Sequence, residues 1–465
     1  MMALSEVARA LKATLLGNDV VFQAVSIDTR TLQPGDLFVA LSGENFDGHV
    51  FVAQAIAKGA CAVLISAPLE SIESMNAGAS VPALRVADTR LALGQLSAAW
   101  RARFSIPVIA VTGSNGKTTT KEMLAAIFGQ RGSVLATQGN LNNEIGVPLT
   151  LLRLRKEHRY AVIEMGASHP GEIAYLSGLA RPTVALITNA AVAHLGGFGS
   201  LDEVARTKGG IYESLADTGV GVVNADDAYA SMWRGVISER RCITFGMRTA
   251  TDVHANMDEV KCHMGSQAVT TCFEIHTPVG NVAVALPLLG AHNVMNALAA
   301  SAAALAAGAT LDDIRNGLQG MHPVKGRLTI KRGVHGVRVI DDTYNANPPS
   351  VRAAIDVLAA ATGQKVLVLG DMGELGDDAP AFHAQMGIQA QAAGINQLYA
   401  VGDLSRLAVQ SFGNGGHHYA SHETLIAALT AALQGLGSST TVLVKGSRFM
   451  RMERVVDAIV ISTAT

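Results

Sequence analysis

Short apolar runs alternate with helical patterns along most of the chain. In the first 85 residues, the runs DLFVAL (36–41), CAVLIS (61–66) and PALRVA (82–87) predict strands, and residues 52–58 predict a helix. Apolar runs of this length, bounded by polar residues, are typical of strands buried on both faces. The first segment therefore predicts a small α/β unit.

The same alternation continues in two further regions. The middle region carries the runs VIAV, YAVIEMG, TVALITN and GVGVVNADD, and the region after His322 carries VRVIDD, KVLVLG, QLYAVG and TTVLVKGS. Strands that alternate with helices predict parallel, doubly wound sheets with ligands at the carboxyl ends of the strands. We expect three α/β domains, at 1–85, 86–320 and 321–465.

One of these strands leads into a glycine-rich turn. VIAVTGSNGKTTTKEML (108–124) combines a buried strand, two glycines and a helix with apolar residues on one side. A helix N-terminus preceded by such a turn directs backbone N–H groups and a positive dipole end at an anion. The spacing between the glycines is two residues shorter than in the common phosphate loop. The predicted nucleotide-phosphate contacts are Gly113, Ser114, Asn115, Gly116, Lys117, Thr118 and Thr119.

Composition narrows the possible partners. The chain has 465 residues, of which 49% are hydrophobic, and a formal net charge of −2. This balance gives no global attraction to nucleic acid or to an anionic membrane surface. The four cysteines form no C-x-x-C pair, and the first residues show no basic start followed by an apolar block. The alanine-rich stretch from Asn296 predicts a packed helix that does not span a membrane, so we expect a cytoplasmic protein.

Three residues of the middle region are candidates for catalysis. Glu164 ends a strand of the sheet that carries the phosphate loop, a position suited to a second magnesium ligand beside the Thr118 hydroxyl. His194 follows another strand, although a lone histidine is more often structural. Lys208 lies in a helical stretch, where a lysine is usually a solvated charge.

Polar residues near the third region leave pairs of interpretations open. Asn293 and Asn296 have the spacing to bond a heterocycle edge, or Asn293 caps a helix. Asp341 and Asp342 could hold ribose hydroxyls or a metal, or start a turn. Lys445, Ser447 and Arg448 either bind an anion or simply form a basic loop. A run of cations at the join is either a solvated face or a nucleotide contact. It comprises Lys325, Arg327, Lys331, Arg332 and Arg338.

Longer motifs carry a resemblance that covers essentially the whole chain. The compressed loop TGSNGKTTTK resembles that of the Mur ligases, and so do GNLNNEIGVPLTLL, EMGASHPGEI, GAHNVMNALAA, DDTYNANPPSVRAAI, LGDMGELG and VLVKGSR. SIDTRTLQPGDLFVALSGENFDGHVF resembles the uridine-nucleotide domain of that family. The resemblance implies a UDP-sugar-binding first domain, a central ATP-binding domain and a Rossmann-like third domain.

The resemblance also implies an activity. A Mur ligase of this type uses ATP and Mg²⁺ to join D-alanyl-D-alanine to UDP-MurNAc-tripeptide through an acyl phosphate. We also expect a monomer that binds no nucleic acid and does not insert into a membrane. By matching position, Thr118, Glu164, His194 and Lys208 belong to the metal site, and Lys208 is a lysine that becomes a carbamate. Lys117 joins Glu164, His194 and Lys208 as a catalytic residue. Nucleotide contacts are implied for Asn293, Asn296, Arg327 and Asp342. Substrate contacts are implied for Ser26, Asp28, Thr29, Arg30, Asn45, Asp47, Gly48, His49, Asn345, Asn347, Lys445 and Ser447.

Two positions depart from the family pattern, and rival functions stay open. Gly196 and Gly210 stand where the family often has acids near His194 and Lys208. The rivals are a sibling Mur ligase, a folylpolyglutamate-type amide ligase and a non-catalytic ATP-binding switch. The uridine-type first domain argues against the folate enzyme. The combination of Glu164, His194 and Lys208 beside the phosphate loop argues against the switch.

Overall fold

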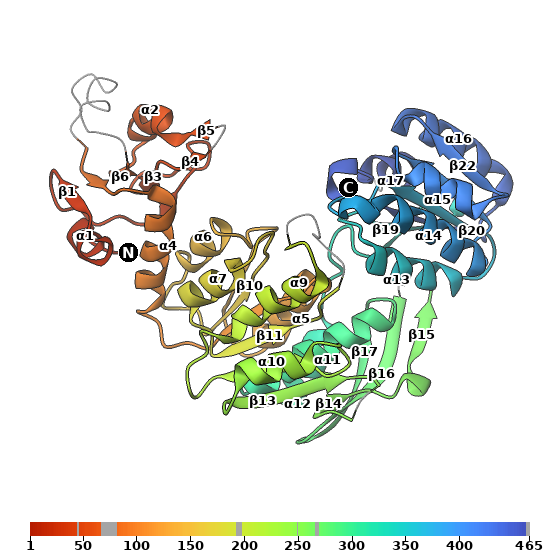
Figure 1. Ribbon diagram of the computed structural model, residues 1–465, viewed down its shortest axis with the longest axis horizontal. Coiled ribbons are helices and arrows are strands. Elements are labelled where there is room, and N and C mark those ends of the chain that lie inside the picture. The colour runs from red at the N-terminus through yellow and green to blue at the C-terminus, as the bar shows by residue number, and fades with distance from the viewer. Residues whose placement is uncertain (44–45, 67–80, 192–197, 249, 266–268, 462–465) are drawn as a thin grey trace.

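The computed structural model describes residues 1–43, 46–66, 81–191, 198–248, 250–265 and 269–461. Its three larger sheets each lie in a lobe of their own, and the first and third lobes lie at opposite ends of the middle one (Figure 1). Mixed α/β architecture with parallel sheets is confirmed. The domain boundaries at 85/86 and 320/321 stay predictions.

The first lobe is a small α/β unit. Its sheet has the order β1-β7-β6-β3-β2, in which β1 is antiparallel to β7 and the other pairs are parallel. The strands are β1 (Thr14–Leu16), β2 (Val25–Ser26), β3 (Leu37–Val39), β6 (Ala62–Ile65) and β7 (Ala83–Arg85), with a hairpin of β4 (Ser42–Gly43) and β5 (Phe46–Asp47) and helices α1 (Leu4–Leu11) and α2 (Val52–Ala57). β3 and β6 are buried along their whole length, as their apolar runs predict.

The middle lobe has a parallel sheet with an antiparallel extension. From β9 to β14 neighbouring strands are parallel, and β15, β16 and β17 continue the sheet with antiparallel pairings. The strands are β8 (Val108–Thr112), β9 (Val134–Ala136), β10 (Tyr160–Glu164), β11 (Val184–Ile187), β12 (Val220–Asn224), β13 (Arg241–Gly246), β14 (Val253–His254), β15 (Lys261–Met264), β16 (Val269–Thr277) and β17 (Gly280–Leu286). The helices are α4 (Thr89–Arg101), α5 (Lys117–Gly129), α6 (Gly146–Leu151), α7 (Glu172–Ala180), α9 (Leu201–Gly209), α10 (Ala230–Ile237), α11 (Ala291–Ala306) and α12 (Leu311–Gln319). The central strand β8 lies between β10 and β11 and leads into the phosphate loop.

The third lobe has the strand order β18-β19-β23-β20-β21-β22, parallel except for the β18–β19 pair. Its strands are β18 (Thr329–Arg332), β19 (Arg338–Asp342), β20 (Lys365–Gly370), β21 (Gln397–Val401), β22 (Gly416–Tyr419) and β23 (Thr441–Lys445). Its helices are α13 (Pro348–Ala359), α14 (Ala379–Ala392), α15 (Ser405–Phe412), α16 (His422–Leu436) and α17 (Glu453–Ile459).

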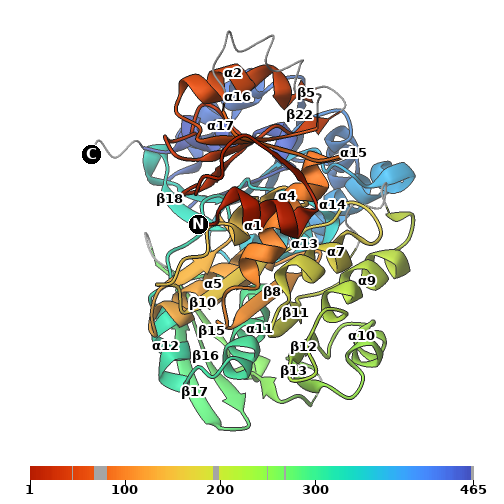
Figure 2. The ribbon, with the colours of Figure 1, turned by 90° about the vertical axis from the view of Figure 1, so that its left-hand side faces the viewer.

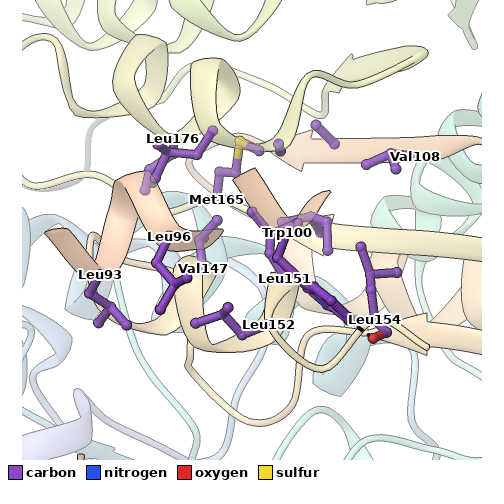
Figure 3. Packing of buried hydrophobic residues seen from close by; sticks show 14 of the residues in the cluster. Leu93, Leu96, Trp100, Val108, Val147, Leu151, Leu152, Leu154, Met165 and Leu176 are labelled. Atoms are coloured by element: carbon purple, nitrogen blue, oxygen red, sulfur yellow. Dashed lines mark hydrogen bonds between the residues drawn. The ribbon is translucent and has the colours of Figure 1, made fainter. Parts of the chain in front are cut away.

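The first and middle lobes share one hydrophobic core. The cluster runs from Leu4 and Val7 on α1, through α4, to α6 and the middle sheet. Figure 2 shows α1 against α4 where the two lobes meet. Trp100 on α4 packs beside Leu96 and Leu151, and its indole N–H donates to the Leu154 carbonyl at 3.1 Å (Figure 3). The α4 helix therefore fixes the first lobe to the phosphate-loop sheet.

The alanine-rich stretch predicted as a packed helix is α11, whose residues from Asn296 to Ala304 are all buried. Small side chains allow this helix to pack closely on α5 and the middle sheet. Among the described residues, no helix is long and apolar enough to span a bilayer.

Candidate active site

The phosphate loop lies between β8 and α5, at the carboxyl edge of the middle sheet. Gly113 has φ +149° and Gly116 has φ +81°, values that favour glycine. A Cβ atom at Gly113 would lie 1.9 Å from Thr188 Oγ1, and one at Gly116 would lie 2.2 Å from Asn296 Oδ1. Both glycines are therefore required by backbone conformation and by close neighbours.

Side chains after β11 support the loop. Asn189 Oδ1 accepts from the Asn115 N–H at 3.0 Å, and Thr188 Oγ1 donates to the Asn115 carbonyl at 2.6 Å. Ser114 Oγ donates to the Ala191 carbonyl and accepts from its N–H, each at 2.9 Å. Thr188 and Asn189 were not among the predicted site residues, although both stand at the end of the TVALITN strand, where ligand-facing groups are expected.

Lys117 begins α5 and folds back over the loop. Its Nζ donates to the carbonyls of Gly113 at 2.7 Å and Ser114 at 3.3 Å. Burial lowers the pKa of Lys117, and the neighbouring Glu164 carboxylate opposes that shift. The positive charge of Lys117 therefore lies over the phosphate loop, where a nucleotide phosphate would bind.

Glu164 and Thr118 form the part of the site that fits a divalent cation. Glu164 Oε1 accepts from Thr118 Oγ1 at 3.2 Å and from Asn142 Nδ2 at 2.9 Å. Glu164 Oε2 is buried without a hydrogen-bond partner, and a buried carboxylate oxygen of this kind suits a hard cation. Within the described residues, no group of three His, Cys, Asp or Glu could form a complete metal cage. An ion here would need further oxygens from nucleotide and water, as is usual for Mg²⁺.

Lys208 lies inside the middle lobe. It sits near the end of α9 with 4% of its surface exposed. Burial and the positive charge of Lys117 hold the pKa of Lys208 well below its usual range. The structure thus places Lys208 close to the phosphate loop as an amine that loses its proton easily, unlike a solvated lysine.

The two glycine departures have different outcomes. A Cβ at Gly210 would lie 3.0 Å from the Ala174 Cβ and 3.1 Å from its backbone nitrogen, so α7 packs closely on Gly210 and would have to shift to admit an acidic side chain. Gly196 and the predicted metal ligand His194 lie outside the described residues.

The asparagine pair lies on α11 behind the loop. Asn293 is inside the helix and Gly290 is the N-cap residue, so the capping interpretation of Asn293 is wrong. Asn293 Nδ2 donates to the Leu289 carbonyl at 2.7 Å, and Asn296 Nδ2 donates to Asn293 Oδ1 at 3.1 Å. Both asparagines are buried, and Asn296 contacts the loop at Gly116.

Two hydrogen bonds join the third lobe to the phosphate loop. Arg327 Nη2 donates to Thr118 Oγ1 at 3.0 Å, and its guanidinium stacks over the Tyr344 ring at 4.3 Å. Asn347, the N-cap of α13, donates from Nδ2 to Asn115 Oδ1 at 2.8 Å. Of the cations at the join, Arg327 therefore faces the loop, and its buried Nε has no partner.

Lys445 and Asp342 form a buried ion pair at 2.6 Å in the third lobe. Burial raises the pKa of Asp342, and the ammonium of Lys445 opposes the rise. Lys445 also donates to the Asn345 carbonyl at 2.9 Å, so its charge is already engaged. Asp341 accepts from Lys331 at 2.7 Å and from the Thr343 hydroxyl at 2.7 Å. These bonds hold the loop after β19 in place.

The predicted uridine residues lie at the carboxyl edge of the first sheet. Arg30 has an 87% exposed side chain and pairs with Asp28 at 2.6 Å. Hydrogen bonds from Arg30 lower the pKa of Asp28 to about 2. Ser26 Oγ donates to the Asp28 carbonyl at 3.0 Å, and Thr29 Oγ1 donates to Gln54 at 2.9 Å. Arg30 is therefore the accessible group of this set.

His49 occupies a different environment. Its Nδ1 lies 2.6 Å from Asp47 Oδ1, and its Nε2 accepts from the Ser66 N–H at 3.0 Å. The ring is buried and holds the β4–β5 hairpin against the end of β6. A Cβ at Gly48 would lie 2.7 Å from the Leu41 carbonyl oxygen, so this turn needs glycine. Asn45 lies outside the described residues.

The fold and the site define a nucleotide-binding α/β protein with a phosphate loop at the carboxyl edge of its central sheet. Three family models match the chain: "Mur ligase family, catalytic domain" at 21–101, "Mur ligase middle domain" at 111–304 and "Mur ligase, glutamate ligase domain" at 326–448. The chain belongs to the Mur ligase family.

Similar proteins support this assignment over the full length. UDP-N-acetylmuramoyl-tripeptide–D-alanyl-D-alanine ligase of Escherichia coli K12 is 46% identical over 98% of each chain. A crystal structure of MurF from Acinetobacter baumannii superimposes with a TM-score of 0.89 at 39% identity, covering 97% of each chain. MurF of Thermotoga maritima in complex with ADP gives a TM-score of 0.81 at 28% identity, covering 94% of this chain and 96% of that one.

Proposed function

We propose that the protein is an ATP-dependent, ADP-forming ligase that joins D-alanyl-D-alanine to UDP-N-acetylmuramoyl-tripeptide. The main observation behind the proposal is that three groups lie close together in this member of the Mur ligase family. The phosphate loop, the partnerless oxygen of Glu164 and the guanidinium of Arg327 lie together where the middle and third lobes meet.

The reaction has two steps. The terminal carboxylate of the tripeptide attacks the γ-phosphorus of ATP, which forms an acyl phosphate and releases ADP. The amine of the dipeptide then attacks the acyl carbon, and the tetrahedral intermediate collapses to an amide and phosphate. Because two anions must approach each other in the first step, catalysis depends on concentrated positive charge and on positioning.

The chain supplies that charge from two sides. Lys117 reaches the outer phosphates from the middle lobe, and Arg327 approaches them from the third lobe with a free Nε–H. Thr118 and Glu164 would hold a magnesium ion, which neutralises phosphate charge when it is bound. The buried amide pair of Asn293 and Asn296 supports the nucleotide side of the cradle.

Lys208 is proposed to act as a carbamate. Carbamylation needs a neutral amine, and the lowered pKa of Lys208 provides one. The amine nitrogen adds to the carbon of carbon dioxide and loses a proton, which leaves an anionic oxygen pair on the side chain. That group would stand beside the cations of the loop, where Lys117 otherwise repels the ammonium form of Lys208.

The first lobe is proposed to bind the uridine nucleotide of the peptide substrate. Arg30 is the exposed cation at its carboxyl edge, and His49 keeps the β4–β5 hairpin in position through Asp47 and Ser66. We further infer a monomer that works in the cytoplasm, where ATP and nucleotide-linked precursors are available.

The test is an assay of phosphate release. Each UDP-MurNAc-tripeptide, with diaminopimelate or lysine as third residue, is supplied with ATP and Mg²⁺, in the presence and absence of D-alanyl-D-alanine. We expect sustained release only with tripeptide and dipeptide together. The proposal would be refuted if phosphate release did not depend on the dipeptide, or if it required a folate substrate and glutamate. Absence of any substrate-dependent release would favour the non-catalytic switch.

A further inference from the structure

A crevice is expected at one point of the third sheet. Core residues of α13, α14 and α15 pack on one face of the sheet, and those of α16 and α17 pack on the other. Strand β23 lies between β19 and β20, and it leads to α17 whereas its neighbours lead to α13 and α14. Loops from adjacent strands therefore part to opposite faces, which is where open α/β sheets bind ligands.

Three loops are tied together at this point by Ser447. Ser447 Oγ accepts from the Gly373 N–H at 2.8 Å and donates to the Ala346 carbonyl at 3.1 Å. The Ser447 N–H donates to the Asp371 carbonyl at 3.0 Å. The loops after β19, β20 and β23 thus share one hydroxyl group, so a shift of any of them changes the floor of the crevice.

The loop after β20 is held from behind by His383. This histidine lies on α14 and is fully buried. Its Nε2 accepts from the Met372 N–H at 2.9 Å, and its Nδ1 lies 2.7 Å from the Ala379 carbonyl. Because a backbone N–H can only donate, Nε2 carries no proton, and the single proton of the neutral ring is on Nδ1. Burial lowers the pKa of His383, which favours this neutral form.

Within the loop after β20, His383 holds Met372 but not Asp371. Asp371 is fixed separately, because its carboxylate accepts from the N–H and the hydroxyl of Ser405. Met372 and Gly373 follow: the Met372 N–H is held by His383, and the next N–H along the backbone, that of Gly373, donates to Ser447. Without that acceptor, the Met372 N–H would be buried and unpaired, a state that favours movement of the backbone.

We propose that His383 is a positioning residue for the amine substrate: it holds the 371–376 loop so that Gly373 and Ser447 complete the crevice that binds the D-alanyl-D-alanine dipeptide. The inference rests on the proposed function, because it assigns the crevice to the amine substrate of that reaction. His383 itself does not touch the substrate.

Two substitutions separate the two bonds of the ring. In His383→Asn the amide nitrogen takes the place of Nδ1 and keeps the bond to Ala379, but nothing accepts from Met372. In His383→Gln the longer side chain brings its oxygen to the place of Nε2 and keeps the bond to Met372. His418→Asn is the matched control, because it removes an exposed histidine of the same lobe whose Nε2 lies 2.8 Å from the Gly402 carbonyl.

We expect His383→Asn to raise the KM for D-alanyl-D-alanine about tenfold, equal to about 1.4 kcal/mol, with the KM values for ATP and UDP-tripeptide nearly unchanged. His383→Gln and His418→Asn should stay near wild type. Equal changes in all three KM values, or equal damage from Asn and Gln, would overturn the proposal, because a purely structural role predicts that result. Wild-type activity measured in parallel separates this outcome from failure of the proposed function.

Hydrogen exchange provides a second measurement that does not depend on folding of a variant. The wild-type enzyme with UDP-tripeptide and a non-hydrolysable ATP analogue is compared with and without the dipeptide. We expect the amides of 371–376 to exchange more slowly when the dipeptide is added. Unchanged exchange in this segment would contradict the assignment of the crevice.

Discussion

Replacing Glu164 with glutamine tests the metal site most directly. The side chain is 2% exposed at the end of β10, and its Oε1 already has two donors in Thr118 and Asn142. Glutamine keeps the shape and the acceptor for those donors. It places an amide nitrogen where the partnerless Oε2 lies and removes the negative charge.

The expected effect of Glu164→Gln on stability differs between the metal-free protein and the protein with bound magnesium. The substitution removes a buried negative charge, but it leaves an amide nitrogen as unpaired as Oε2, at the same cost of about 1–3 kcal/mol, so the metal-free variant should be about as stable as wild type. In the loaded protein, ligand at 100 times its dissociation constant stabilises wild type by about 2.7 kcal/mol. The variant should lose the magnesium-dependent part of this gain. Phosphate release should fall by about 10²-fold or more, as when one preorganised electrostatic group is removed.

The assay combines thermal unfolding with phosphate release across a magnesium series, at fixed ATP. Glu213→Gln, at an exposed glutamate of the same lobe, serves as the control and should match wild type in both measurements. A Glu164→Gln protein that keeps its magnesium-dependent thermal shift would show that Glu164 is not a ligand. A variant that unfolds without metal would show that the carboxylate is a structural anchor.

Three further perturbations have defined outcomes. Lys208→Ala should lose activity and regain part of it when acetate or propionate is added. Lys208→Arg should stay inactive, because the guanidinium group keeps its proton. Full activity of Lys208→Ala in carbonate-depleted buffer would contradict carbamylation. Lys117→Ala should abolish phosphate release and, because it removes the hydrogen bonds to the Gly113 and Ser114 carbonyls, lower the stability by about 1–3 kcal/mol, checked by chemical denaturation. Arg30→Ala should raise the KM for UDP-tripeptide only, and an equal rise for ATP would contradict the assignment of the first lobe. In that variant the pKa of Asp28, measured by NMR, should rise from about 2 toward 3.8. Because the native pKa is the lowered one, the pair stabilises the fold above pH 4 and this contribution disappears as the pH falls toward 2.

The parallel part of the fold could be predicted because its strands are continuous apolar runs. The antiparallel extension formed by β15, β16 and β17 was not predicted. In β16 the buried residues Phe273 and Ile275 alternate with the half-buried Cys272, Glu274 and His276. That pattern has period two, but the buried positions are few and polar residues flank them, so a search for continuous apolar runs misses it. The strands β1, β2, β18 and β22 are likewise short or partly polar.

The site was predictable as a set of motifs but not as a set of contacts. Each motif marks the carboxyl end of a strand, and the topology brings those ends together within one lobe. The contacts between lobes depend on how separate surfaces fit. Asn347 bonds to Asn115 across 232 positions, and Arg327 bonds to Thr118 across 209. The local pattern of either partner contains no information about such a bond, and the same is true of the support that Asn142 gives to Glu164.

The hydroxyl of Thr118 connects the metal site to the placement of the third lobe. A threonine hydroxyl has one hydrogen to donate and two lone pairs to accept with. The hydrogen goes to Glu164, and one lone pair accepts from Arg327. One lone pair is left, and a magnesium ion needs one from each oxygen ligand. The bond from Arg327 is therefore compatible with a loaded site, so the third lobe can keep its contact with the phosphate loop while the ion is bound. It follows that Arg327 can contribute its remaining N–H groups to the phosphates without first leaving Thr118.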